Sequence, residues 1–346
     1  MRTLTFIMTI FLLLPANVIN HSFTVKNKSL AGGEDSLTVM FWNLENFFDW
    51  KPDSLSASPS DKEFSSFGKK HWTRGRFKAK CSAIAKSVFW VMEQEGRLPD
   101  VIGVAEVENR YVLEKLLDWT PLYKADYRIV HFDSSDPRGI DVALLYRSSR
   151  LELLEEKPFG VVDRNGARML TRDILLAKFR RMDGDSIAFL VNHHPSKYGG
   201  KTGRRREAAL KSLRRLSDSL VGAGCRNIVA MGDFNDTPEN PAFGILTDSL
   251  EGERAYSSPL VNLASELAGR GEGTIRYSGI WELIDMFFVS GNMLADGRVP
   301  QMKVLRIPFL TVRDNAHSGE KPLRTYTGPR YSGGVSDHCP ILLVIP

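Results

Sequence analysis

Short apolar runs separated by polar turns recur along the chain and predict a large number of β-strands. The folded part opens with one such run at 37–42, and a wholly apolar run, 101–105, follows Pro99-Asp100. Runs of about four to eight residues bounded by turn residues are typical of buried strands. The same pattern predicts further strands at 127–132, 141–146, 174–179, 187–192, 227–231, 283–289 and 340–345.

Helical spacing of apolar side chains predicts two long helices and a shorter one. The first has an apolar face whose members recur every three or four residues: Phe77, Cys81, Ile84, Val88 and Met92. Gly96 supplies the usual stop signal for this helix. The second long helix covers 203–220, with Leu210, Leu213, Leu216 and Leu220 on one side. Asn109 caps the shorter helix, which is expected to reach Leu117.

Many strands with a few interspersed helices predict an α/β domain built on two packed sheets. Polar stretches at 49–71, 251–273 and 313–335 are expected to be loops. No repeat of 20–50 residues and no long Pro- or Ser-rich linker divides the chain. Residues 23–346 are therefore expected to form a single domain.

The first 22 residues have the pattern of a cleaved secretory signal. Arg2 precedes a mostly apolar stretch, 4–14, and Pro15-Ala16 follows it. About 11 residues are too few to span a bilayer, which needs roughly 20. We therefore expect a secreted or periplasmic protein without a stable membrane span.

Composition excludes several classes of protein. With 346 residues, 42% hydrophobic and 25% charged, the chain is neither disordered, nor collagen-like, nor a multi-span membrane protein. The formal net charge of +5 fits a polyanionic partner, but also a basic protein that has none. Only three cysteines are present, and Cys81 and Cys225 are expected in the core rather than in a disulfide or zinc site.

Side chains that bind cations or phosphate stand at the ends of several apolar runs. They are Asn43, Glu106, His193, the pair Asp233 and Asn235, Asp285, and the pair Asp337 and His338. A sheet scaffold commonly presents a functional site at its strand ends. Carboxylate and amide oxygens favour hard cations such as Mg²⁺, Mn²⁺ or Ca²⁺. Asp285 lies within the apolar run 283–289, where a carboxylate needs a partner.

The order of these motifs resembles the endonuclease/exonuclease/phosphatase superfamily, over about residues 37–346. The motifs are Trp42-Asn43, Glu106 in Ala-Glu-Val-Glu-Asn, Asn192-His193, Gly232-Asp233-Phe234-Asn235, Ile284-Asp285 and Ser336-Asp337-His338. Secreted bacterial members that begin Trp-Asn-x-Glu-Asn are the most similar. The resemblance implies a four-layer α/β sandwich, with two mixed sheets face to face and helices outside.

The resemblance also implies a metal site and a phosphate site. Glu106 corresponds to the principal metal carboxylate, and Asn43 lies beside it. Asp337 corresponds to a further carboxylate at the metal or the phosphate. The expected cofactor is Mg²⁺, with Mn²⁺ or Ca²⁺ as alternatives.

The remaining motif residues correspond to the catalytic group. The resemblance implies that Asp233 orients or deprotonates the attacking water and that Asn235 donates to a phosphate oxygen. His338 would contact the scissile phosphate and be held by Asp285, and His193 would be the second histidine. In-line attack on phosphorus needs these parts: a positioned water, a cation and donors to the oxygens.

Several neighbouring residues have both a functional and a structural interpretation. Arg138 is expected to contact a phosphate and Asp141 to support His193, with a surface arginine and a strand-start carboxylate as the alternatives. His194 is expected in the core or at the surface, because it faces away from His193 in a strand. Glu45 and Glu108 are possible supports for the metal site.

Three basic or aromatic features invite a functional interpretation. Gly200-Lys201-Thr202 is not the end of a P-loop, because Pro195 occupies the position of the first required glycine. Residues 204–206 are three arginines, expected at a solvated helix start but able to contact phosphate. Trp72 is expected to pack beneath its loop rather than to stack on a base.

These observations favour a secreted, monomeric, metal-dependent phosphodiesterase, and within that class an endonuclease acting on nucleic acid by in-line attack of water. The alternative within the same chemistry is a phosphatase or phospholipase C-type enzyme acting on inositol phosphates or sphingomyelin. An alternative of another class is a binding module that has kept the fold without catalysis. Loss of Glu106 or His338 would mark such a module, and both residues are present.

Overall fold

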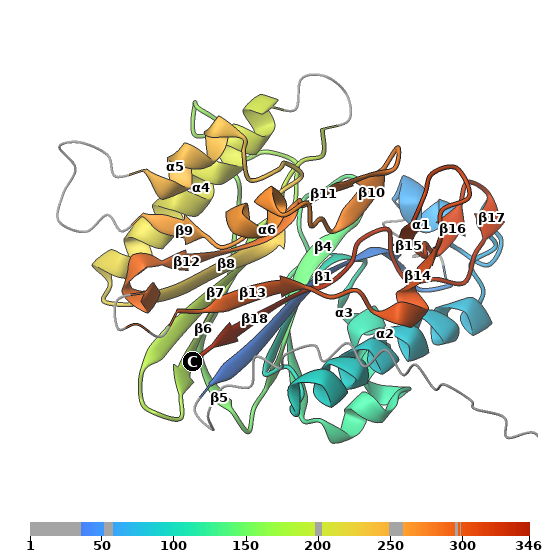
Figure 1. Ribbon diagram of the computed structural model, residues 1–346, viewed down its shortest axis with the longest axis horizontal. Helices are drawn as coiled ribbons and strands as arrows, with labels where there is room; N and C mark the ends of the chain where they lie inside the picture. The colour runs from blue at the N-terminus through green and yellow to red at the C-terminus, as the bar shows by residue number, and fades with distance from the viewer. Residues whose placement is uncertain (1–35, 52–57, 198–202, 249–258, 295–296, 298) are drawn as a thin grey trace, which may run out of the picture.

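Two six-stranded mixed sheets, packed face to face, form the centre of the molecule (Figure 1). The computed structural model describes residues 36–51, 58–197, 203–248, 259–294, 297 and 299–346. The expected signal sequence and Gly200-Lys201-Thr202 lie outside these residues. No helix within them combines the length and the apolar character needed to cross a membrane.

The first sheet has the strand order β13-β18-β1-β2-β4-β3. Its strands are β1 (Leu37–Phe47), β2 (Val101–Val107), β3 (Tyr127–His131), β4 (Asp141–Arg147), β13 (Gln301–Val304) and β18 (Ile341–Ile345). Only β1 and β2 run parallel among the pairs of this sheet. Each central strand is buried on both faces, which explains its nearly continuous apolar sequence.

The second sheet has the order β5-β6-β7-β8-β12-β9. Its strands are β5 (Leu151–Phe159), β6 (Ile174–Arg181), β7 (Ser186–His193), β8 (Asn227–Asp233), β9 (Leu260–Asn262) and β12 (Asp285–Ser290). Here β7 and β8 form the parallel pair. The C-terminal ends of the parallel pairs β1–β2 and β7–β8 lie at the same edge of the sandwich. The polar residues at these strand ends therefore lie close together.

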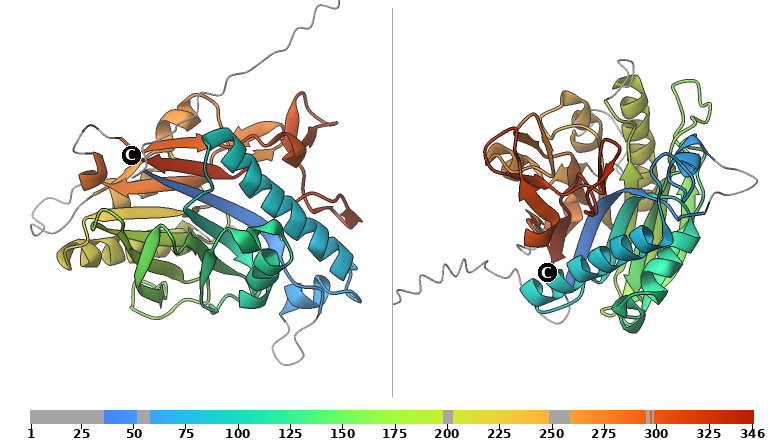
Figure 2. Two further views of the ribbon diagram at one scale, coloured as in Figure 1. Left: turned by 90° about the horizontal axis from the view of Figure 1, so that it is seen from below. Right: turned by 90° about the vertical axis from the view of Figure 1, so that its right-hand side faces the viewer.

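Helices cover the outer faces of both sheets, so the four-layer sandwich is confirmed (Figures 1 and 2). The first sheet packs against α2 (Arg74–Glu95) and α3 (Arg110–Asp118), and the second packs against α4 (Gly203–Gly222). The predicted caps are present, because Asn109 accepts from the amide of Val112 and Gly96 is left-handed at φ 75°.

The structure corrects several details of the predicted elements. Met92 is 38% exposed, and Val91 is the buried residue of that helical turn. The edge strand β5 was not predicted, because Glu152, three consecutive charged residues at 155–157 and Pro158 interrupt its apolar sequence. The strand expected at 283–289 begins only at Asp285, which places this carboxylate at a strand end.

The three expected loops contain short elements. They are α1 (Pro59–Glu63), α6 (Ser265–Gly269), β9, and parts of the hairpins β14–β15 (Thr311–Arg313, Glu320–Pro322) and β16–β17 (Tyr326–Thr327, Arg330–Tyr331). A further hairpin, β10–β11 (Ile275–Tyr277, Ile280–Glu282), and the short helix α5 (Gly244–Thr247) complete the main elements. Trp72 is fully buried and donates from Nε1 to the carbonyl of Phe48 at 2.8 Å, so it packs beneath its loop as expected.

Candidate active site

Three neighbouring strands of the second sheet place Asp285, Asp233 and His193 side by side. Asp285 pairs with Asp233 across the antiparallel strands β12 and β8, and His193 pairs with Asp233 across the parallel strands β7 and β8. Paired residues on adjacent strands are separated by roughly 5 Å, so their side chains can interact directly. The strand register alone therefore brings together three of the predicted catalytic residues.

The close approach of β7 and β8 requires Gly232. A Cβ atom at this position would lie 2.3 Å from the carbonyl oxygen of Asn192, which is far inside van der Waals contact. Any side chain here would separate the two strands just before Asp233. This explains the glycine of the Gly-Asp-Phe-Asn motif.

The first sheet contributes Asn43 and Glu106 from the parallel strands β1 and β2. The pairing register shifts after Asn43, where Glu45 and Asn46 adopt left-handed φ values of 46° and 54°. Glu106 is also left-handed, at φ 60°. In this geometry the amide of Asn46 donates to Glu106 Oε2 at 2.9 Å. Left-handed backbone costs energy for residues other than glycine, so surrounding contacts must hold this edge in place.

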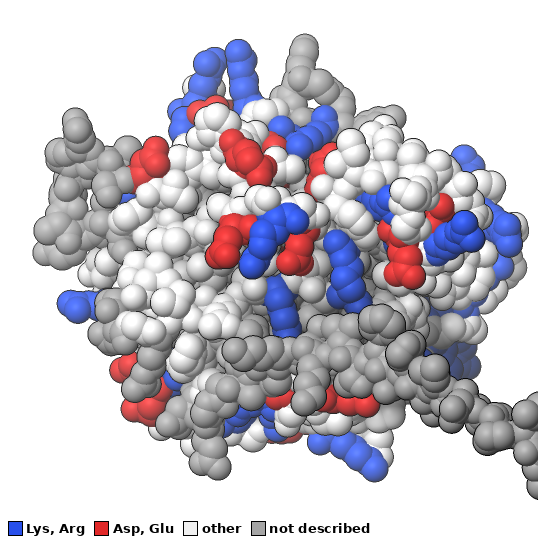
Figure 3. Space-filling view, viewed as in Figure 1, with Lys and Arg blue, Asp and Glu red and all other residues white. Residues whose placement is uncertain are grey.

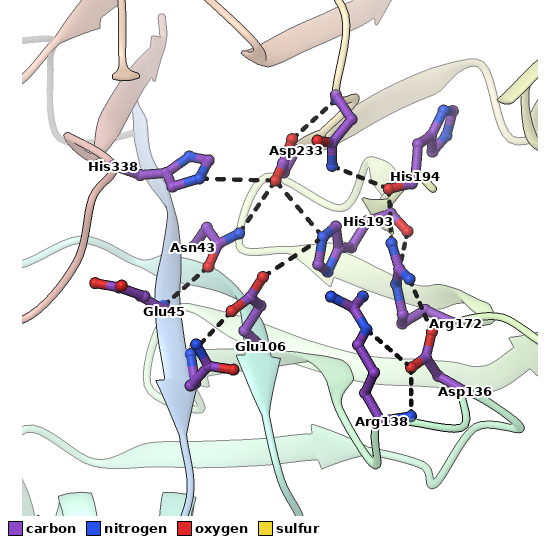
Figure 4. Close-up of polar contacts among 12 residues, drawn as sticks. Asn43, Glu45, Glu106, Asp136, Arg138, Arg172, His193, His194, Asp233 and His338 are labelled. Atoms are coloured by element: carbon purple, nitrogen blue, oxygen red, sulfur yellow. Dashed lines mark hydrogen bonds and ion pairs between the residues drawn. The ribbon is translucent and has the colours of Figure 1, made fainter. Parts of the chain in front are cut away.

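Asp233 contacts side chains that come from both sheets (Figure 4). Its Oδ2 accepts from Asn43 Nδ2 at 3.1 Å and lies 3.6 Å from His193 Nε2 and 3.9 Å from His338 Nε2. Burial raises the pKa of Asp233 to about 7, although the charge of His338 acts in the opposite direction. A carboxyl group with such a pKa can exchange a proton near neutral pH.

Asp285 contacts His338, as the motif order implies. The distance from Asp285 Oδ2 to His338 Nδ1 is 2.8 Å, and both side chains are buried. Burial by itself would lower the pKa of His338, but Asp285, together with the carboxylates of Asp233 and Asp337, outweighs it and raises this pKa well above its usual range. The ring of His338 is therefore held as an imidazolium at neutral pH.

His193 has the opposite protonation. Burial, with the nearby positive charges of Arg172 and Arg138, lowers its pKa well below the usual range. Its Nε2 lies 3.9 Å from Glu106 Oε1 and 3.6 Å from Asp233 Oδ2. Facing two carboxylates, this nitrogen carries the proton of the neutral ring. The site thus combines one charged and one neutral imidazole around the same carboxylate.

Glu106, Asp337 and Glu45 border one cleft of about 340 Å³ and offer oxygen ligands for a hard cation. Burial and the neighbouring charge of Asp337 raise the pKa of Glu45 to about 7, even though Arg324 contacts both carboxylates at 2.6 and 3.1 Å. A divalent cation would offset the same repulsion. The three carboxylates fit Mg²⁺, Mn²⁺ or Ca²⁺. Asn43 lies beside them, but its amide oxygen accepts from the amide of Glu45 at 2.9 Å.

The sequence matches the model of the Endonuclease/Exonuclease/phosphatase family over residues 38–346. The chain belongs to this family. Members of the Endonuclease/Exonuclease/phosphatase family are divalent-metal-dependent phosphoester hydrolases, in agreement with the residues around the cleft. No curated protein matches the chain at a significant level of sequence similarity.

Solved structures of the family share the fold at low sequence identity. A mannosyl-6-phosphatase of Bacteroides thetaiotaomicron VPI-5482 is 17% identical, with a TM-score of 0.56, over 89% of this chain and 98% of that chain. D. rerio TDP2 complexed with single strand DNA product is 15% identical, with a TM-score of 0.52, over 90% and 99%. The human Nocturnin catalytic domain with bound sulfate anion is 15% identical, with a TM-score of 0.54, over 90% and 94%.

Two residues predicted to contact phosphate, Asn235 and Arg138, are only partly available to a substrate. Asn235 is left-handed at φ 52°, and its Nδ2 donates to the carbonyl of His194 at 3.0 Å. Since an amide nitrogen carries two hydrogens, one remains for a phosphate oxygen. Arg138 borders the cleft, where its side chain points toward His193 while its Nε contacts Asp136 at 3.3 Å (Figure 4).

The expected support of His193 by Asp141 is wrong. The carboxylate of Asp141 accepts from the amide of Ser134 at 2.8 Å and lies 3.4 Å from His131 Nε2. The reason is topological, since β4 pairs with β3 in the first sheet whereas His193 ends β7 in the second. Asp141 is thus a structural residue at a strand start, which was the alternative interpretation.

The other neighbouring residues divide between the cleft and the scaffold. Glu45 borders the cleft, whereas Glu108 accepts from the backbone amide of Asp49 at 2.8 Å and lies outside it. His194 is buried against the ring of Phe234, with 4.8 Å between the ring centroids. Arg206, from the arginine triplet, pairs with Asp236 at 3.1 Å.

Arg172, which was not predicted from the sequence, holds the backbone at His193 and His194. Its buried guanidinium donates to the carbonyl oxygens of His193 at 3.0 Å and His194 at 2.6 Å, and it pairs with Asp136 at 2.8 Å. The only signal in the sequence is the position of Thr171-Arg172-Asp173 directly before the apolar strand β6. Charged residues at such a position are usually solvated, so the sequence gives no reason to expect a buried arginine.

Replacement of Asp285 by asparagine tests the charged pair. Asp285→Asn keeps the side-chain shape but removes the charge that favours imidazolium, so the pKa of His338 should fall. The protonated ring would then be lost at lower pH, and the alkaline limb of the pH–rate profile should move to lower pH. We expect kcat to fall about 10²-fold.

NMR titration of His338 in both proteins, together with the pH–rate profile, checks this expectation. Asp118→Asn, at a side chain that is 61% exposed on α3, is the matched control and should change neither quantity. An unchanged pKa of His338 in the Asp285 variant would show that the carboxylate only ties down neighbouring backbone.

Proposed function

We propose that this family member is a nuclease that hydrolyses the phosphodiester bonds of nucleic acids. The observation that carries the proposal is the Asp233 carboxylate, which is faced by Asn43, His193 and His338 at the floor of an arginine-lined cleft. Such a carboxylate can orient a water molecule and take its proton as attack on phosphorus begins. Asn43 fixes the direction of the carboxylate.

The two histidines have complementary roles at the phosphate. The imidazolium of His338, held by Asp285, donates a charged hydrogen bond to a nonbridging oxygen as negative charge develops there. The neutral ring of His193 donates from Nε2 without adding a positive charge. Glu106, Asp337 and Glu45, with Asn43 beside them, would hold the divalent cation, which would supply charge stabilisation at the phosphoryl and leaving-group oxygens.

The walls of the cleft support a polymeric phosphodiester as substrate. Arg138, Arg276, Lys321 and Arg324 border it, and such side chains bind backbone phosphates. Tyr277, at its rim, is 72% exposed and offers an aromatic face on which an unpaired base can stack. On the face seen in Figure 3, basic and acidic side chains are interspersed, so recognition is assigned to the cleft rather than to a continuous basic surface.

A phosphomonoester substrate is the second candidate. The cleft of about 340 Å³ is compact enough for a sugar phosphate. A mannosyl-6-phosphatase is among the proteins of similar fold. The same catalytic groups would then release inorganic phosphate without cleaving a strand.

A panel of substrates separates these candidates. Purified protein is incubated with single- and double-stranded DNA, RNA, sphingomyelin, inositol polyphosphates and mannose 6-phosphate, with Mg²⁺ or with EDTA. We expect strand cleavage that stops in EDTA and returns with Mg²⁺ or Mn²⁺. His338→Ala should lower kcat by about 10²-fold or more, because it removes a donor to the phosphate.

The other results of the panel are equally informative. Full activity in EDTA would contradict the metal-dependent mechanism. Phosphate release from mannose 6-phosphate or inositol polyphosphates without strand cleavage would replace the nuclease by the phosphatase. Hydrolysis of sphingomyelin alone would favour the phospholipase.

We further propose that the protein acts as an exported monomer after cleavage of its first residues. Arg2, the apolar stretch 4–14 and Pro15-Ala16 motivate this proposal. Mass spectrometry of the protein exported by its host should give an N-terminus at about residues 17–25, given the usual length of a signal. An exported protein that still begins at Met1 would contradict cleavage.

A further inference from the structure

Lys80 lies beneath the edge of the cleft, with only 2% of its surface exposed. It projects from α2, and lysine is almost never buried without partners. Its Nζ donates to the carbonyl oxygen of Glu45 at 2.6 Å and to the hydroxyl oxygen of Thr325 at 2.9 Å. These two acceptors are 280 residues apart in the chain, and each belongs to a segment that presents site residues.

The Glu45 end of this contact holds the left-handed turn that follows Asn43. Glu45 and Asn46 have φ values of 46° and 54°, and the Asn46 amide donates to the carboxylate of Glu106 at 2.9 Å. A strained turn persists only where surrounding contacts determine it. The Lys80 ammonium is such a contact, because it binds the carbonyl between the two strained residues.

The Thr325 end holds the segment that leads to Asp337 and His338. The Thr325 hydroxyl lies 2.9 Å from the carbonyl oxygen of Val335, to which it donates. The amide of Gly334 donates to the carbonyl of Arg324 at 3.1 Å. A Cβ at Gly334 would lie 1.8 Å from the carbonyl oxygen of Leu323. The backbone around Thr325 is therefore in direct contact with the backbone that leads to Asp337.

We propose that Lys80 is a positioning residue that ties the Glu45 turn to the Thr325 segment, so that Glu106 near the end of β2 and His338 just before β18 meet the same phosphate. Lys80 contacts neither the substrate nor the reacting atoms. Misplacement of catalytic groups by about 1 Å can cost roughly 10²-fold in rate, so such a tether can control catalysis from a distance. The proposal relies on the proposed hydrolysis only for its kinetic measurement.

Lys80→Met removes the two hydrogen bonds while keeping the length of the side chain. Lys78→Met, at an exposed position of the same helix, is the matched control. With Mg²⁺ and bis(p-nitrophenyl) phosphate, we expect kcat of Lys80→Met to fall by about 10-fold or more and KM to change by less than about 3-fold. Lys78→Met should match the wild type.

Hydrogen exchange provides a measurement that does not depend on activity. In Lys80→Met, peptides covering 43–48 and 334–338 should both exchange faster, while the rest of α2 keeps its protection. Thr325→Val removes the other end of the tether. It should show a smaller fall in kcat and a smaller increase in exchange in 43–48 and 334–338. In the double variant Lys80→Met/Thr325→Val, kcat and the exchange rates should be close to those of Lys80→Met alone, because the tether is already broken.

The following results would overturn the proposal. One is a folded Lys80→Met protein with kcat within about 2-fold of wild type and unchanged exchange in both segments. Another is faster exchange throughout α2 and the sheets, which would make Lys80 a general stabiliser of the fold. If the wild type hydrolyses no phosphodiester, the proposed function fails, while exchange in the two segments still decides the role of Lys80.

Discussion

The candidate site depends on the hydrogen bond between Asn43 and Asp233, because this bond joins the ends of the two sheets. Asn43 ends the regular part of β1 in the first sheet, and Asp233 ends β8 in the second; their side chains meet at 3.1 Å. Face-to-face packing of the apolar strands brings these ends within reach. A shift of either sheet would separate Glu106 from Asp233 and leave the buried carboxylate without its amide donor.

Burial determines how the charges at this junction behave. It raises the pKa of Asp233 to about 7 and keeps His193 neutral, whereas the contact with Asp285 keeps His338 charged. The same residue types thus acquire different protonation states from their different neighbours. This division suits hydrolysis, which needs an acceptor for the water proton and donors for the phosphate oxygens.

Some features of the sequence specify this arrangement directly and others do not. Central strands are buried on both faces, so 101–105 and 227–231 could be recognised from their apolar runs. That Asp285 has a partner could be expected because a carboxylate among apolar residues needs one, whereas the choice of His338 came from the family resemblance. By contrast, the partner of Asp141 depends on which strand lies next to β4. Arg172 and Lys80 were missed because charged side chains on helices and loops are usually solvated.

These missed residues share one physical task. Arg172 binds the carbonyls of His193 and His194 at the end of β7, and Lys80 binds the Glu45 carbonyl in the left-handed part of β1 after Asn43. Both satisfy backbone groups where strands end and no ladder partner remains. The motif residues supply the chemistry, and buried cations hold the backbone that carries them.

The most direct test of this account is the rate of single-stranded DNA cleavage by Asp233→Asn under Mg²⁺. Asparagine keeps the shape of the side chain but cannot take a proton from water. The account predicts a fall in kcat of about 10²–10⁴-fold, with the fold and the binding of DNA retained. Cleavage by a folded Asp233→Asn protein at nearly the rate of the wild type would contradict the central role of this carboxylate.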